Sequence, residues 1–195
     1  ATGGATTEDR LDLLVLVGDL LALEHAATLP LTEQAALHAA HSLECQHIGR
    51  VDEALASRRT ALALHRQLGD RRNEGLDLCE LAVAAQYHEG AQAGLRHIQA
   101  AIDVLERVGA RHEPAVAYAA KAQMHLLDES QSAFDFGLKA LALLEGLDGA
   151  EECRAYALNT VASMRLRSQD VPEGWALLNR SRDIALQHGC ESHAA

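Results

Sequence analysis

A spacing of 40 residues is the feature that most constrains what this chain can fold into. Three rows of residues with different chemical character repeat at that spacing. The first row is glycine, the second is small and the third is aliphatic: Gly69, Gly109, Gly149 and Gly189; Ser42, Ala82, Ala122 and Ala162; Leu64, Val104, Leu144 and Ile184. Because three unrelated rows share one period, the sequence predicts an array of a single repeated unit.

Within each period, apolar residues recur at the spacing of an amphipathic helix. Only three prolines occur in 195 residues, which leaves room for long helices. The sequence predicts one helix from about Thr7 to Ala27, followed by helices at about 32–48, 51–68, 71–88, 91–108, 111–127, 130–147, 150–167 and 171–188. Because the linkers between them are short, consecutive helices are expected to pack as antiparallel neighbours.

The predicted helix ends have identifiable signals. Pro30 should end the first helix, since the residue before a proline avoids helical backbone angles. Thr32 is then predicted to cap the next helix, with the acidic Glu33 in its first turn. Each glycine of the 40-residue row is expected just after a helix, in the left-handed conformation that closes the last carbonyls.

We predict a single helical-repeat domain over residues 1–195. Its parts are a frayed end at 1–7, an unpaired helix at 8–28, helix pairs at 32–70, 71–110, 111–149 and 150–189, and the start of a truncated helix at 190–195. Since the last segment begins a repeat unit without completing it, we expect the chain to be a fragment of a longer protein.

Small residues stand in the middle of each first helix and again early in each second helix. The first set is the row that begins at Ser42, and the second is Ala54, Gly94 and Gly174, with Phe134 as the exception. Helix pairs of this kind resemble tetratricopeptide repeats, and the 40-residue period resembles their longer-helix variety. The first-helix aromatic residue usual in that family is missing here, where the row reads Cys45, Ala85, His125 and Arg165. The resemblance implies an all-α fold, a right-handed α-solenoid of antiparallel helix pairs.

The last third of the chain carries a narrower resemblance. Residues 155–162 read Ala-Tyr-Ala-Leu-Asn-Thr-Val-Ala, and residues 173–189 read Glu-Gly-Trp-Ala-Leu-Leu-Asn-Arg-Ser-Arg-Asp-Ile-Ala-Leu-Gln-His-Gly. These stretches resemble the repeat region of large ATP-binding LuxR-type transcriptional regulators of bacteria, which lies between an ATPase and a helix-turn-helix. Neither a Gly-x-x-x-x-Gly-Lys-Ser/Thr motif nor a basic recognition helix occurs in this sequence. The resemblance therefore implies the regulatory middle region alone, and a free-standing tetratricopeptide scaffold that binds partner proteins is the alternative.

The charge and the cysteines exclude several classes of function. The formal net charge is -11 without a basic cluster, so direct contact with nucleic acid is not expected. The most apolar stretch, residues 11–31, is interrupted by Asp12, Asp19 and Glu24, which argues against a membrane span. The four cysteines form no Cys-x-x-Cys pair, so we expect reduced thiols and a cytoplasmic protein.

One predicted helix carries a cluster of potential metal ligands. His38, His41 and Cys45 stand at i, i+3 and i+7 and share a face, which would suit zinc or iron. In the other pairs the two histidine positions hold Leu78, Tyr118 and Leu158, and Leu81, Lys121 and Val161. These are packing positions of the repeat, so we expect no metal and no cofactor, and we keep a metal-binding helical protein as an alternative.

Catalysis is not expected from the distribution of titratable residues. Acid–base chemistry requires two or three such groups that converge in a cleft. The acidic residues here are scattered, and Glu151 and Glu152 begin a helix, where the helix dipole favours negative charge. No Gly-x-Ser-x-Gly or comparable nucleophile motif occurs, so the sequence predicts no enzyme.

Binding is the remaining role, because stacked helix pairs form a long surface lined by first helices. The groove positions of the tetratricopeptide family project onto four sets: Ala39, Leu43 and Gln46; Cys79, Val83 and Gln86; Ala119, Gln123 and Leu126; Asn159, Ser163 and Leu166. The residues predicted to contact a ligand are Gln46, Gln86, Gln123, Asn159, Ser163 and the nearby Arg165. This neutral lining favours an amphipathic helix or peptide, an adjacent domain of the same chain, or a small uncharged effector. The alternative is a groove that binds no ligand. Separately, the uncapped ends of the solenoid would expose apolar surface, which allows a homodimer.

Overall fold

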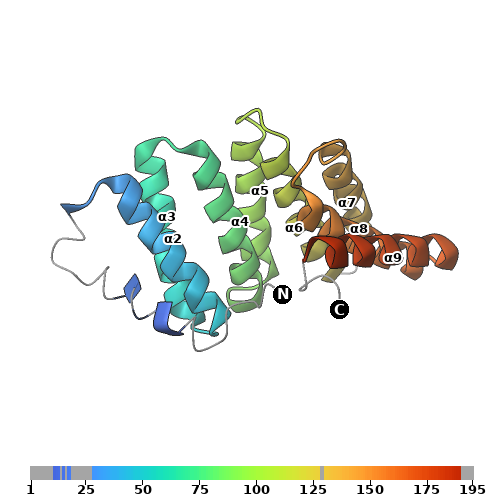
Figure 1. Ribbon diagram of the computed structural model, residues 1–195, viewed down its shortest axis with the longest axis horizontal. Helices are drawn as coiled ribbons and strands as arrows, with labels where there is room; N and C mark the ends of the chain where they lie inside the picture. Colours follow the sequence, from blue (N-terminus) through green and yellow to red (C-terminus); the bar gives the residue numbers. More distant parts are fainter. Residues whose placement is uncertain (1–10, 14, 16, 19–27, 128–129, 190–195) are drawn as a thin grey trace.

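The computed structural model describes residues 11–13, 15, 17–18, 28–127 and 130–189. Eight α-helices have described bounds, and these residues contain no β-strand. The helices are α2 (Leu31–His47), α3 (Val51–Leu68), α4 (Arg71–His88), α5 (Ala91–Leu105), α6 (His112–Leu127), α7 (Ser132–Leu143), α8 (Glu151–Arg167) and α9 (Val171–His188). They are arranged along the long axis of the molecule, with α2 in blue toward one end and α9 in red at the other (Figure 1).

The helices associate in pairs, α2 with α3, α4 with α5, α6 with α7 and α8 with α9. Neighbouring pairs meet through α3 and α4, α5 and α6, and α7 and α8. The first helices also contact each other directly, α4 with α6 and α6 with α8. Each pair therefore packs on its neighbours along the array, as in a solenoid, and the predicted fold class is confirmed.

Small residues set the distance between the helices of a pair. The row Ser42, Ala82, Ala122 and Ala162 is fully buried throughout. At Gly94, an added Cβ would lie 2.9 Å from the backbone oxygen of Ala82, so α5 crosses α4 at very close range. One continuous apolar cluster then extends from Leu55 in α3 to Ala157 in α8. Small residues thus allow close backbone approach, and large buried side chains such as Leu81, Ile98 and Leu105 fill the space around them.

The glycine row adopts the predicted left-handed conformation. The φ angles of Gly69, Gly109, Gly149 and Gly189 are +70°, +83°, +72° and +71°. Gly69 and Gly189 directly cap α3 and α9. An added Cβ would meet nothing within 4 Å at any of the four positions, so the backbone conformation, and not a lack of space, requires glycine there.

Two second helices end earlier than the sequence predicts. α5 ends at Leu105 and α7 at Leu143, whereas the predicted ends are residues 108 and 147. Past each end the chain continues in a tight turn. After α5, the N–H of Val108 donates to the carbonyl of Leu105 at 3.1 Å. The same i to i−3 hydrogen bond, also 3.1 Å long, joins Leu147 to Leu144. These bonds tighten the last helical turn, so Gly109 and Gly149 follow a turn instead of the helix itself.

The predicted cap at Thr32 is wrong. α2 begins at Leu31 with Pro30 as its N-cap, and the carbonyl of Pro30 accepts hydrogen bonds from the N–H groups of Glu33 (2.9 Å) and Gln34 (3.1 Å). Proline is well suited to a helix start, because its φ is already near the helical value and it has no N–H to satisfy. Thr32 is therefore an exposed residue of the first turn, which also contains Glu33 as predicted.

The two ends of the chain are only partly described. Residues 11–13, 15 and 17–18 are helical, within the segment predicted as an unpaired helix. The rest of that helix, the predicted frayed end at 1–7 and the predicted helix start at 190–195 lie outside the described residues. In the described part of the chain, no helix is both long and apolar enough to cross a membrane.

Candidate functional site

The first helices α4, α6 and α8 enclose a hollow of about 440 Å³, called here the first-helix groove. It lies where these helices contact each other, on the surface that the repeat pattern predicts for binding. Eleven residues line it: Cys79, Glu80, Val83, His112, Val116, Ala119, Ala120, Gly149, Glu152, Cys153 and Tyr156. The groove thus combines positions from three successive repeats.

The floor of the first-helix groove is uncharged. Cys79 and Ala119 are buried, and both Cys79 and Cys153 are free thiols. Burial raises the pKa of each of these thiols to about 12, so both stay protonated at neutral pH. Burial also raises the pKa of the Tyr156 phenol to about 12. The floor therefore offers small apolar surfaces and neutral polar groups.

The sides of the groove are partly apolar and partly acidic. Val83 and Tyr87 stand one turn apart on α4 and are 44% and 67% exposed. Tyr87 is not a lining residue, but it adds to the burial-driven rise in the pKa of Tyr156, so it lies near the groove. Glu80 and Glu152 contribute carboxylates from α4 and α8. The lining of the groove therefore includes both exposed apolar area and two acidic residues.

The residues predicted to contact a ligand are dispersed. Among the projected positions, Cys79, Val83 and Ala119 line the hollow, whereas none of the six predicted contact residues does. Gln86 faces α5 instead, because its Cβ lies 2.9 Å from the place where a Cβ on Gly94 would be. Gln46, on α2, is half-buried outside this hollow.

The other predicted contacts lie on α6 and α8. Gln123 accepts a hydrogen bond from Oγ1 of Thr160 at 2.9 Å, which joins α6 to α8. Ser163 donates to the backbone carbonyl of the exposed Asn159 at 2.9 Å. Arg165 turns toward α7, where its guanidinium carbon lies 4.6 Å from the ring centroid of Phe134, the exception in the small row. The structure does not gather these side chains into one site.

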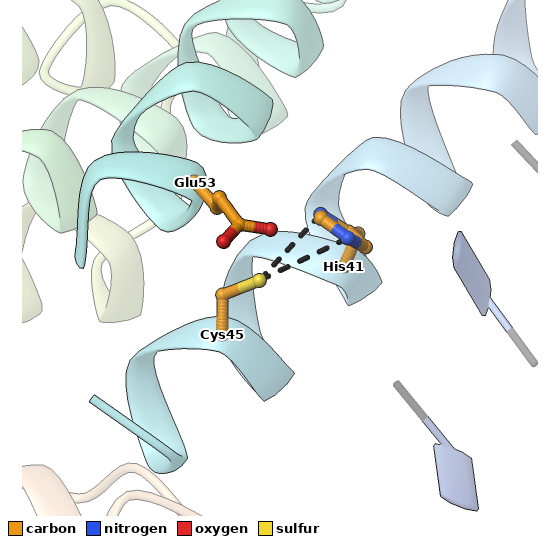
Figure 2. Close-up of side chains that lie close together, drawn as sticks. All are labelled: His41, Cys45 and Glu53. Atoms are coloured by element: carbon orange, nitrogen blue, oxygen red, sulfur yellow. Dashed lines mark hydrogen bonds between the residues drawn. The ribbon is translucent and has the colours of Figure 1, made fainter. Parts of the chain in front are cut away.

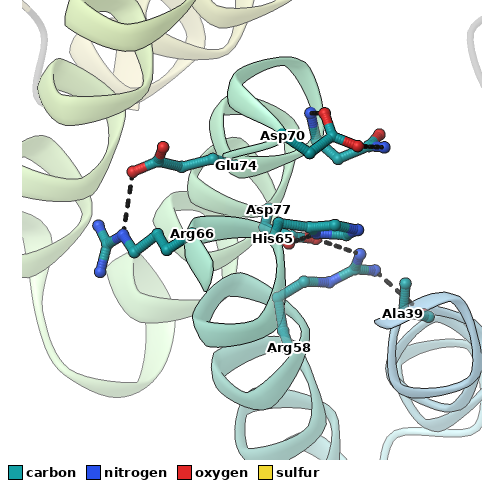
Figure 3. Close-up of polar contacts among 8 residues, drawn as sticks. Ala39, Arg58, His65, Arg66, Asp70, Glu74 and Asp77 are labelled. Carbon is teal, nitrogen blue, oxygen red and sulfur yellow. Dashed lines mark hydrogen bonds and ion pairs between the residues drawn. The ribbon is translucent and has the colours of Figure 1, made fainter. Parts of the chain in front are cut away.

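A buried ion network holds α4, the first wall of the groove, against α3 (Figure 3). Nη1 of Arg58 donates to Oδ1 of Asp77 at 3.0 Å, and Nδ1 of His65 lies 2.6 Å from Oδ2 of the same carboxylate. The three side chains are only 10%, 3% and 10% exposed. Nη2 of Arg58 also donates to the backbone carbonyl of Ala39 on α2, at 3.4 Å. The carboxylate thus joins α4 to α3, and Arg58 extends the network to α2.

Sequence reasoning missed this network, although the 40-residue register contains its signal. The positions equivalent to Arg58 hold Ile98, Leu138 and Leu178, and those equivalent to Asp77 hold Leu37, Ala117 and Ala157. Charged residues are rarely buried unless they are paired. An arginine and an aspartate that replace apolar residues in two facing rows therefore indicate a buried pair.

A separate cluster joins α2 to α3 at the start of the array (Figure 2). One potential metal-ligand atom from each of His41, Cys45 and Glu53 lies within 4.8 Å of the others. Cys45 is fully buried, His41 is half-buried and Glu53 is exposed. The predicted third member, His38, lies outside this set, and its Nδ1 is buried without a hydrogen-bond partner among the described residues. Glu53 was not predicted. Its equivalents in the other three pairs are Ala93, Ala133 and Glu173, so the repeat register gives no consistent signal for it.

Comparisons with solved structures identify the architecture. BtubC (BKLC) from P. vanneervenii superimposes with a TM-score of 0.73 at 14% identity, over 93% of this chain and 75% of that chain. A crystal structure of a putative kinesin light chain with nearly identical TPR-like repeats from Podosopora anserina gives a TM-score of 0.61 at 14% identity, over 94% of this chain and 86% of that chain. This chain has a tetratricopeptide-like solenoid fold. No protein-family model and no curated protein sequence matches it.

The tetratricopeptide-like solenoid carries its two candidate sites in different places. The first-helix groove spans α4, α6 and α8, whereas the His41, Cys45 and Glu53 cluster lies between α2 and α3. The buried network around Asp77 lies between them along the chain. Substitutions in one site can therefore be made without touching the residues of the other.

Proposed function

We propose that this solenoid is a non-catalytic protein-interaction module whose first-helix groove binds an amphipathic helix with basic residues beside its apolar face. The observation that carries the proposal is the exposed apolar pair Val83 and Tyr87, which stands beside an uncharged floor. Grooves of this kind bind the apolar face of a helix, whose side chains fill the hollow. Exposed apolar area that borders a pocket is a common mark of an interaction site.

Charge selects among amphipathic helices. Glu80 and Glu152 belong to the lining of the groove, and the whole chain has a formal net charge of -11. A basic partner is therefore attracted over long range and finds carboxylates where its flanking residues arrive, whereas an acidic partner is repelled. A neighbouring domain of the same polypeptide could supply such a helix.

A small uncharged effector is the competing occupant. The hollow of about 440 Å³ falls within the range of about 300–1,000 Å³ that small ligands occupy. Such a ligand would use the neutral floor and would not need the exposed side chains above it. Val83 should therefore contribute to the binding of a helix but not to the binding of a small effector.

The test uses fluorescence anisotropy with two labelled helical peptides that share a leucine face and carry either lysine or glutamate on the polar face. We expect the lysine peptide to bind and the glutamate peptide not to bind. Val83→Glu should weaken binding at least about tenfold, about 1.4 kcal/mol, because the new carboxylate would be buried against the leucine face. Leu186→Glu is the matched control, since Leu186 is equally apolar, is 64% exposed and lies on α9 outside the groove.

Both variants add one negative charge, so a purely electrostatic association would strengthen equally in both. Equal affinity of Val83→Glu and Leu186→Glu would therefore refute the groove as the binding site. Absence of binding to either peptide, together with a rise in melting temperature on addition of an uncharged small molecule, would assign the groove to an effector instead.

We further propose that the solenoid forms the regulatory middle region of a larger ATP-binding LuxR-type transcriptional regulator. The support is the resemblance of residues 155–162 and 173–189, which lie in α8 and at the end of the array. Sequencing the open reading frame on both sides is the test. A P-loop upstream and a basic helix-turn-helix downstream are expected; a frame that contains neither would favour the free-standing scaffold.

A further inference from the structure

We propose that His41, Cys45 and Glu53 bind one zinc ion, which joins α2 to α3. A thiolate, an imidazole and a carboxylate are all established types of zinc ligand, and the mixture of soft sulfur with nitrogen favours zinc over magnesium or calcium. Three protein ligands leave the fourth position of a tetrahedral site to water. This inference does not depend on the function proposed for the first-helix groove, since no residue is shared.

The distances between ligand atoms fit a single ion. Sγ of Cys45 lies 3.7 Å from Nδ1 and 3.8 Å from Nε2 of His41. A tetrahedral zinc ion with bonds of about 2.3 Å to sulfur and about 2.1 Å to nitrogen separates the two atoms by about 3.6 Å. The two side chains stand one turn apart on α2, so the helix itself maintains this separation. Because Sγ is almost equidistant from the two ring nitrogens, the imidazole must turn for the lone pair of Nε2 to point at an ion bound by Sγ.

Ser57 orients the imidazole. Its Oγ lies 2.7 Å from Nδ1 of His41, within hydrogen-bond distance. When Nδ1–H donates to this oxygen, Nε2 presents its lone pair to the ion, which is the usual arrangement of a metal-binding histidine. Ser57 is itself buried on α3, so the second helix contributes both a ligand and the group that positions another ligand.

Glu53 brings its carboxylate from the first turn of α3 and is available for coordination. Arg50 contacts only its Oε1, at 2.6–2.7 Å, which leaves Oε2 for the ion. The ion pair with Arg50 competes only weakly with the metal for the Glu53 carboxylate, because both side chains are about half exposed to solvent. Zinc replaces the thiol proton of Cys45, which is released to water, and no oxidation or reduction is involved.

The repeat does not need these residue types for packing. In the second pair, the positions of His41, Cys45 and Glu53 hold Leu81, Ala85 and Ala93, and all three are buried in the same fold. The ligand set therefore belongs to the first pair alone among the first three pairs. The sequence-based expectation of no metal considered His38 in place of Glu53, which the structure brings to the cluster from α3.

The test is zinc titration of the reduced, chelator-treated chain by isothermal calorimetry, with cobalt(II) as a spectroscopic probe. We expect one zinc ion per chain, and for cobalt a near-ultraviolet thiolate band with the intense visible bands of a four-coordinate ion. Cys45→Ser should abolish the thiolate band. Glu53→Gln should weaken binding at least about tenfold, and because Glu53 is half exposed this variant keeps the fold.

His38→Ala is the matched control, since it removes a histidine one turn away on the same helix and should bind zinc as the wild-type chain does. Failure of the wild-type chain to take up zinc stoichiometrically would overturn the proposal. So would wild-type affinity in Glu53→Gln. Loss of binding in His38→Ala with retention in Glu53→Gln would assign the metal to the three-residue set on α2 instead.

Discussion

Asp77→Ala is the substitution that most directly tests how the first two helix pairs are held together. It removes the one carboxylate that pairs with both Arg58 and His65, and it leaves a guanidinium group buried without a counter-ion. Loss of one partner from a buried ion pair costs about 3–5 kcal/mol, because the other charge keeps its desolvation penalty and loses its compensation. We therefore expect the free energy of unfolding to fall by about 3–5 kcal/mol.

Urea unfolding followed by far-ultraviolet circular dichroism measures this loss. With a slope of about 2 kcal/mol per molar urea, the midpoint should fall by about 2 M. Glu89→Ala is the matched control, since it removes an acid from an exposed ion pair with Arg59 and should change stability by less than about 1 kcal/mol. Hydrogen exchange should locate the weakening at α2, α3 and α4, because stability in a repeat array is largely local.

A triple variant separates the penalty of an unpaired charge from the value of the network. Arg58→Ile, His65→Leu and Asp77→Ala together copy the residues that stand 40 positions later, Ile98, Leu105 and Ala117. Replacement of a whole buried ion network by apolar residues is often neutral or stabilising, so the triple variant should recover most of the loss. A single variant that loses less than about 1 kcal/mol, or a triple variant no more stable than the single one, would refute the reasoning.

Three further predictions concern single positions. Gly109→Val should destabilise the chain by more than about 1 kcal/mol in the same urea assay, because φ is +83° there; a neutral result would show that the backbone can relax. Burial would raise the pKa of Glu74, but hydrogen bonds from Arg66 and Arg71 outweigh it and hold the pKa below the usual 4.5. The stability that Glu74 contributes is then complete above pH 4.5 and is lost as the pH falls further, so the difference between the wild-type chain and Glu74→Gln should narrow in acid; a constant difference would contradict the assignment. At Cys79, whose pKa rises from 9.0 to about 12, the thiolate fraction at neutral pH is about a thousandfold lower than in the unfolded chain, so alkylation followed by mass spectrometry should be slow until urea is added. A fast reaction in the folded chain would show that the groove opens.

The helices and their order could be predicted from the sequence because their causes are local. A helix repeats every 3.6 residues, so apolar spacing reports it directly, and a glycine marks the place where the chain must turn left-handed. Gly69 and Gly189 directly follow α3 and α9 with positive φ, so these single-residue predictions are confirmed. The error at Thr32 had an equally local origin, since Pro30 and Thr32, two positions apart, are both suited to the start of a helix, and α2 has Pro30 as its N-cap.

The candidate sites were predictable only in part. His41 and Cys45 share a face of one helix, which sequence spacing reports, whereas Glu53 reaches them from the next helix. Gln86 shares a face with Cys79, yet the start of α5 covers that end of α4 at Gly94, so only Cys79 lines the groove. Position on a helix face is a property of the sequence, but what covers that face is not.

The sequence by itself determined that this protein is a repeat of helix pairs. The helical spacing and the glycine caps follow from residues close together in the chain, and the 40-residue period can be read by comparing the rows directly. Only the tertiary structure decided that Asp77 meets Arg58 and His65 and that Glu53 joins His41 and Cys45. The physical reason is that contacts between helices depend on crossing angle and on the separation of their axes. Small residues such as Ala82 and Gly94 set that separation together, and no single stretch of sequence contains it.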